Sequence, residues 1–179
     1  MPDPFEIPAD LPAPLVPLAW MIGRWEGVGV VGYPSLEKES RFGQEVELRH
    51  DGRPFLHYRS QAYLLDDDGN QVRPLASETG YWRVVVPDDI EAAAREASGV
   101  DVEVLLAHPT GFVEIYLGRA DGARVDLSTD VVARTVTAKE YTAAKRMYGM
   151  VKGDLLWVMD MAAVGRPMTS HASARLKKV

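Results

Sequence analysis

The side chains of this chain that could bind a transition metal through nitrogen are its four histidines. Cysteine is absent, so a disulfide, an iron–sulfur cluster, a thiolate metal ligand and a cysteine nucleophile are excluded, and histidine and carboxylates remain as protein ligands. His171 is the strongest candidate, because it lies inside the strand-like segment 168–178. Thr169 and Ser173 share its face of that strand, and alternation alone does not decide whether this face points inward.

The remaining histidines and acids have weaker claims to a site. His50 precedes a turn, His57 alternates with its neighbours along a strand pattern, and His108 stands before a proline at a hairpin. Three acids could suggest a paired-carboxylate site, but they fall on separate strands with no identifiable acid-base partner: Glu45, Glu78 and Glu114. The chain also lacks a serine elbow, a phosphate-binding glycine loop and an HExxH motif.

Length and composition indicate one globular domain that binds neither nucleic acid nor membranes. The 179 residues match one domain, and 46% hydrophobic with 26% charged residues are ordinary globular values. No apolar run approaches the roughly 20 residues of a transmembrane helix. The net charge of −6 disfavours binding to phosphate backbones. Residues 1–6 lack the basic and apolar regions of a secretory signal, so we expect a cytoplasmic protein.

Turn residues divide most of the chain into short strand-like segments. Asp51-Gly52, Asp121-Gly122 and Lys152-Gly153 are typical of tight hairpins, so neighbouring strands should pair antiparallel. We expect an all-β, antiparallel up-and-down barrel of about ten strands, although strands at this spacing also fit a sandwich. Some segments could be pieces of one bent strand. The segments are 24–31, 40–49, 54–65, 72–76, 79–86, 100–108, 111–119, 123–128, 130–138, 141–151, 154–163 and 168–178.

Two regions depart from the strand pattern. Residues 1–17 hold six prolines, too many for a regular helix, and are expected to pack on the body as an N-terminal cover. Residues 18–22 are expected to form a short helical turn, which places the barrel domain at 18–179. The alanine-rich segment 88–97, followed by Gly99, predicts a helix inserted between two strands.

Glycine and tryptophan alternate along the first strand. Gly23, Trp25, Gly27 and Gly29 place their side chains on one face. Glycines beside a bulky indole let the strand bend and let another element approach closely. We interpret this motif as structural, with the tryptophan closing one end of a barrel.

This motif and the C-terminal segment 161–176 resemble the nitrobindins, small haem-binding β-barrels related in shape to fatty-acid-binding proteins and lipocalins. The resemblance implies one haem b per chain, with His171 as the axial iron ligand. It also implies that Lys139 lies near a haem propionate and that Met161 lines the pocket; a solvated turn lysine and a core methionine are the alternative interpretations. Further similar segments follow in family order: 33–34, 42–46, 52–58, 77–83 and 106–114.

The resemblance also implies an enzyme, a peroxynitrite isomerase. Its ferric haem would bind nitric oxide and convert peroxynitrite to nitrate at an open sixth position, so that His171 acts in catalysis through the iron. Ala76 departs from the family, in which a histidine often precedes the segment 77–80, and implies a roomier and more apolar pocket wall. The alternatives are a non-catalytic carrier of an apolar small molecule, which does not need His171, and a nitric-oxide or haem sensor. Oligomeric state, including a homodimer, stays open.

Overall fold

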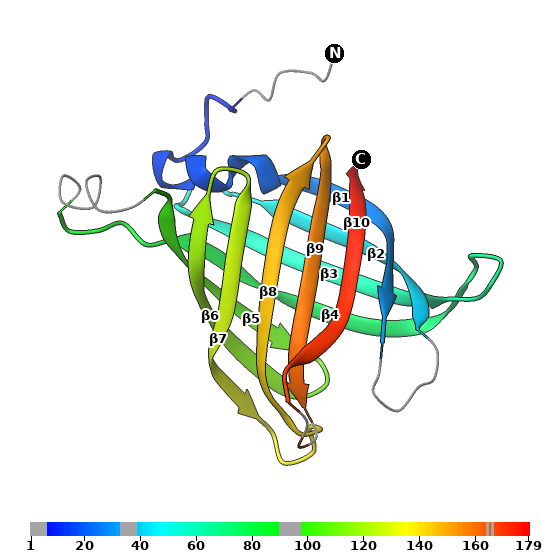
Figure 1. The fold of residues 1–179 in the computed structure, drawn as a ribbon. Helices are drawn as coiled ribbons and strands as arrows, with labels where there is room; N and C mark the ends of the chain where they lie inside the picture. The colour runs from blue at the N-terminus through cyan, green and yellow to red at the C-terminus, as the bar shows by residue number, and fades with distance from the viewer. Residues whose placement is uncertain (1–6, 33–38, 90–97, 164, 166) are drawn as a thin grey trace.

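In the computed structural model, which describes residues 7–32, 39–89, 98–163, 165 and 167–179, the chain forms a closed barrel of ten antiparallel strands (Figure 1). Each strand pairs with its sequence neighbours, and β1 closes the barrel against β10. The expected all-β, up-and-down barrel is confirmed. The strands are β1 (Gly23–Val31), β2 (Ser40–Arg49), β3 (Phe55–Leu65), β4 (Gln71–Val84), β5 (Val100–His108), β6 (Phe112–Asp121), β7 (Arg124–Arg134), β8 (Tyr141–Val151), β9 (Asp154–Ala163) and β10 (Thr169–Lys178).

Two pairs of expected segments are single long strands. Segments 72–76 and 79–86 fall on β4, which ends at Val84, and segments 123–128 and 130–138 fall on β7, which ends at Arg134. Irregular register within the β3–β4 and β6–β7 pairs lets these strands bend without ending. The helix expected over 88–97 lies, from residue 90 onward, outside the described residues.

The N-terminal helix begins earlier than expected. A 3-10 helix, η1 (Ala13–Met21), lies across the end of the barrel at which β10 finishes (Figure 1). The helical turn expected over residues 18–22 therefore starts five residues earlier, with Pro14 in its first turn, where no N–H is needed, and Pro17 inside it. Leu15 and Leu18 are fully buried, so the segment covers the barrel end as expected. Among the described residues, no helix is long and apolar enough to span a membrane.

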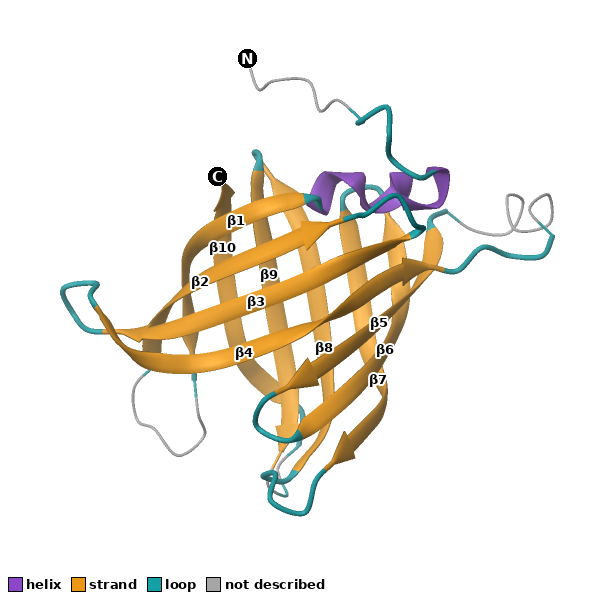
Figure 2. Cartoon of the chain, turned by 180° about the vertical axis from the view of Figure 1, so that it is seen from behind, coloured by secondary structure: helices purple, strands orange, loops and turns teal. Residues whose placement is uncertain are grey.

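The glycine–tryptophan motif joins β1 to its neighbours at that end. Trp25 is 1% exposed, and its indole N–H donates to the Met21 carbonyl of η1 at 2.8 Å. A Cβ on Gly27 would lie 2.1 Å from the Arg175 carbonyl oxygen of β10. Only glycine permits this approach, so Gly27 lets β1 pack closely against β10. Figure 2 shows the wall of β1 to β5, with η1 across its upper end.

Candidate functional site

His171 lies at a β-bulge of β10. In the pairing with β9, Ser170 faces Asp160 and Ala172 faces Met159, so His171 is the extra residue between two regular pairs. Ala172 is buried in the core, and yet half-buried His171 lines the same interior cavity. The bulge explains how two consecutive residues both reach the interior, which strict alternation would forbid.

The His171 imidazole is held against the end of β1 and is neutral at neutral pH. Its own carbonyl accepts a hydrogen bond from the Gly32 N–H at 2.8 Å, and its ring hydrogen-bonds to the Gly32 backbone. Burial lowers the pKa of His171 below its ordinary value of 6.5, and the positive charge of Arg146 lowers it further. The hydrogen bond with Gly32 acts in the opposite direction and raises this pKa. A neutral imidazole oriented by a backbone hydrogen bond is the form that binds metals.

Two adjoining cavities, of about 210 and 100 Å³, lie inside the barrel beside His171. Leu75 of β4 and Met159 of β9 give both cavities apolar walls. The larger cavity also reaches Met161, and the smaller one reaches Phe42. The residues that line both are Leu75, Ala76, Glu78, Arg146, Met159 and His171.

The structure brings together some of the residues predicted from the sequence. Half-buried Met161 lines the larger cavity with His171, and Ala76 lines both cavities. Lys139 is exposed in the turn between β7 and β8, where its carbonyl accepts a hydrogen bond from Arg134 at 3.1 Å. It does not line either cavity, and its role near a bound group stays a prediction.

One side of the larger cavity consists of a charged network that sequence reasoning missed, formed by Glu78, His108, Glu114 and Arg146. Arg146 of β8 donates to both carboxylate oxygens of Glu78 on β4, at 2.7 and 2.9 Å. His108 of β5 lies between two carboxylates, with Nε2 2.5 Å from Glu114 Oε1 and Nδ1 3.7 Å from Glu78 Oε2. Tyrosine hydroxyls complete the carboxylates' hydrogen bonds: Tyr58 donates to Glu78, and Tyr116 and Tyr141 donate to Glu114.

The charges of this network stabilise one another. Burial alone would raise the pKa of Glu78, but Arg146, together with His108 and the Tyr58 hydroxyl, outweighs burial and lowers this pKa from 4.5 to about 2. Burial likewise opposes ionisation of Glu114, yet the hydrogen bond with His108 and the charge of Arg146 lower its pKa. Burial of Arg146 would lower its pKa, but the nearby Glu78 carboxylate raises that pKa well above its ordinary value. Both carboxylates and the guanidinium are therefore charged at neutral pH.

A weak sequence signal for this network exists in the strand pattern. Glu114 stands between Phe112 and Tyr116 at alternate positions of β6, so alternation assigns its side chain to the interior. An acid at an inward position needs a buried partner. Alternation does not identify that partner, because Arg146 is 68 positions from Glu78 in the chain.

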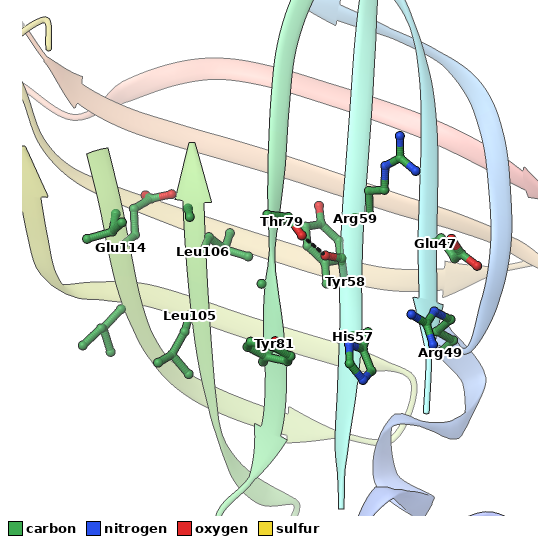
Figure 3. A pocket seen from close by; sticks show the side chains of 14 residues that line it. Glu47, Arg49, His57, Tyr58, Arg59, Thr79, Tyr81, Leu105, Leu106 and Glu114 are labelled. Carbon is green, nitrogen blue, oxygen red and sulfur yellow. Dashed lines mark hydrogen bonds between the residues drawn. The ribbon is translucent and has the colours of Figure 1, made fainter. Parts of the chain in front are cut away.

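A further depression, of about 630 Å³, lies on the outside of the barrel wall (Figure 3). Residues of β2 to β6 line it, among them His57 and Tyr81, whose ring centroids are 5.3 Å apart. At Gly80 a Cβ would lie 1.7 Å from the Leu105 carbonyl oxygen, so the wall packs too closely there for a side chain. His171, Met161 and Lys139 do not line this depression, and we place the candidate site in the interior.

The chain is similar to known proteins along most of its length. Residues 14–178 match the family model of the THAP4-like, heme-binding beta-barrel domain. The ferric nitrobindin-like protein of Kineococcus radiotolerans is 58% identical over 95% of this chain and 96% of its own length. The peroxynitrite isomerase of Leifsonia xyli subsp. xyli is 46% identical over 97% of this chain and 98% of its own length. The crystal structure of Rv2717c from M. tuberculosis, 35% identical, matches with a TM-score of 0.77 over 94% of this chain and 99% of that one.

Proposed function

Because the chain belongs to the family of THAP4-like, heme-binding β-barrel domains, we propose that it is a haem enzyme that isomerises peroxynitrite to nitrate, with His171 as the axial iron ligand. Relatives named peroxynitrite isomerase, at 46% and 44% identity over 97% of the chain, support the reaction. At the level of residues, the proposal depends on one observation. Because of the bulge in β10, the neutral side chain of His171 faces an interior cavity.

The residues around His171 fit a haem group. The imidazole supplies a nitrogen ligand, and its hydrogen bond with the Gly32 backbone is the kind of outer contact that orients metal-binding histidines. Leu75, Met159 and Met161 offer apolar surface to a flat macrocycle. Lys139 would pair with a propionate from the exposed turn beside the barrel, as a point charge.

Haem, when bound, supplies an iron centre with an exchangeable position at which peroxynitrite, or nitric oxide, can bind. The conversion of peroxynitrite to nitrate keeps every atom and electron, so the chain need provide no redox partner and no net proton. His171 would hold the iron through an imidazole nitrogen, and Leu75, Met159 and Met161 would form the apolar side of the cavity around it. Ala76, on the β4 wall of both cavities, has no hydrogen-bond donor in its side chain.

The ligand assignment is tested by haemin titration of the wild type and of His171→Ala. We expect the wild type to give a histidine-ligated ferric spectrum and His171→Ala to lose it, with an unchanged β-rich circular dichroism spectrum. His57→Ala is the matched control, because His57 lies on β3 next to the outer depression and contacts Asp51 at 2.9 Å. If His171→Ala keeps the wild-type Soret band and haem affinity, another residue binds the iron.

The reaction is tested by stopped-flow measurement of peroxynitrite decay with the ferric protein. We expect faster decay, nitrate as the main product and loss of the acceleration when cyanide occupies the iron. A nitric-oxide titration of the same sample tests the binding of that ligand. Equal decay rates with and without haem-loaded protein would eliminate the isomerase and leave a carrier or a sensor.

A further inference from the structure

His108 and Glu78 face each other across a gap that no hydrogen bond closes. The distance from His108 Nδ1 to Glu78 Oε2 is 3.7 Å, beyond hydrogen-bond range. Two protein ligands about 2.1 Å from one zinc ion lie roughly 3.4 Å apart at the tetrahedral angle. The gap therefore matches the separation of two ligand atoms on one divalent transition-metal ion more closely than it matches a direct contact.

The other side of the His108 ring has the partner that a metal-binding histidine needs. Nε2 lies 2.5 Å from Glu114 Oε1. A neutral ring that donates Nε2–H to this carboxylate has its lone pair on Nδ1, the nitrogen that faces Glu78. A carboxylate that fixes the tautomer and orientation of a histidine in this way is the common outer contact of zinc-binding histidines. Phe112, stacked on the imidazole at 4.0 Å between ring centroids, holds its plane.

The charge count of the network also favours a cation. Among the described residues that line the larger cavity, the permanent charges are two carboxylates, Glu78 and Glu114, and one guanidinium, Arg146. Two negative charges and one positive charge leave one negative charge uncompensated. A charge left without compensation at a nearly buried site is costly. A divalent metal ion that carries one anionic ligand, such as hydroxide or chloride, would balance this surplus, as would a proton on His108, and the titration separates the two.

The site is open to small ligands on one side. Glu78, His108 and Glu114 come from β4, β5 and β6 and line the 210 Å³ cavity that also contains His171. Their three candidate ligand atoms lie within 4.8 Å of one another. Coordination positions of the ion that the protein does not fill would therefore face the cavity, where water or a small anion could occupy them.

We propose that His108 Nδ1 and Glu78 Oε2 bind a divalent transition-metal ion such as Zn²⁺ in the barrel interior, with Glu114 orienting His108. Such a centre lines the same cavity as His171 but takes its ligands from β4 and β5 rather than β10, and it does not depend on the function proposed above. Nitrogen and oxygen ligands together suit zinc, cobalt or manganese better than calcium or magnesium.

Zn²⁺ titrated calorimetrically into the full chain, with haem bound and without it, tests the site. We expect one equivalent of Zn²⁺ to bind in both states and in His171→Ala, because His171 is not among the proposed ligands. His108→Gln should abolish binding, and Glu114→Gln should weaken it by on the order of 10–100-fold, as expected for an outer-shell residue. His57→Gln is the matched control: it removes a histidine that also contacts a carboxylate, and should bind Zn²⁺ like the wild type.

A measurement on the wild type alone does not require that any variant folds correctly. Co²⁺ added to the haem-free chain should give visible d–d bands that Zn²⁺ removes, and Zn²⁺ should shift the ring ¹⁵N resonances of His108. Binding that His171→Ala abolishes would move the ion to the haem ligand and overturn the assignment. Absence of Zn²⁺ binding, with His108 doubly protonated at neutral pH, would show that a proton compensates the network.

Discussion

The Glu78–Arg146 pair should make the stability of the barrel depend on acid in a defined pH range. Glu78 bridges β4 to β8 through two hydrogen bonds with Arg146, and its side chain is only 12% exposed. Glu78→Gln keeps the shape of the side chain and removes its charge. We therefore expect this variant to be less stable at neutral pH and to respond less to acid than the wild type.

The magnitude follows from the pKa. Glu78 has a pKa of about 2 in the folded protein against an ordinary value of 4.5, which corresponds to roughly 3 kcal/mol at about 1.4 kcal/mol per unit. Because the folded pKa is the lower one, this contribution is complete above about pH 5 and is lost as the pH falls from 4.5 toward 2. Removal of one partner from a buried ion pair costs a similar amount, about 3–5 kcal/mol.

The assay is urea unfolding followed by tryptophan fluorescence, at pH 7, 5, 4 and 3. The free-energy difference between wild type and Glu78→Gln should be roughly 3 kcal/mol at pH 7 and should shrink steadily below pH 4.5. Asp67→Asn, in an exposed turn, controls for the loss of an acid and should follow the wild type. Parallel stability curves for wild type and Glu78→Gln would refute the view that Arg146 holds this carboxylate ionised.

Three further changes test other parts of the molecule. Gly27→Ala should lower the free energy of unfolding by roughly 3 kcal/mol, because its Cβ would lie 2.1 Å from a β10 carbonyl oxygen. Gly149→Ala is the control, because the nearest atom to its Cβ would be 3.8 Å away. Equal thermal stability of the two variants would contradict the close approach at Gly27. Lys139→Met should weaken haem retention by at most about 1 kcal/mol, measured as the haem off-rate at low salt; an unchanged rate would make Lys139 an ordinary turn residue. Ala76→His adds a donor to the cavity wall and should slow oxidation of the ferrous protein in air severalfold; unchanged autoxidation would place residue 76 away from the iron-bound ligand.

The sequence by itself determined the barrel and the elements that close it. Alternating apolar residues between Asp-Gly and Lys-Gly turns predicted a meander of antiparallel strands. Both the alternation and the turn residues depend only on neighbouring positions in the chain, so they can be read from the sequence alone. The spacing of Trp25 and Gly27 likewise predicted close packing at the first strand, since a missing Cβ matters only where another backbone approaches. The helix at Ala13–Met21 was missed in part, because burial of Leu15 and Leu18 outweighs the prolines around them.

Only the tertiary structure decided how the site is assembled. The side on which His171 lies depends on a bulge in the β10–β9 pairing, and a one-residue shift of register is invisible in the pattern of one strand. The partnership of Glu78, His108, Glu114 and Arg146 joins four strands over up to 68 positions of sequence. Alternation can assign each of these side chains to the interior, but barrel closure and strand stagger decide which of them meet, and the ionisation of each depends on the others.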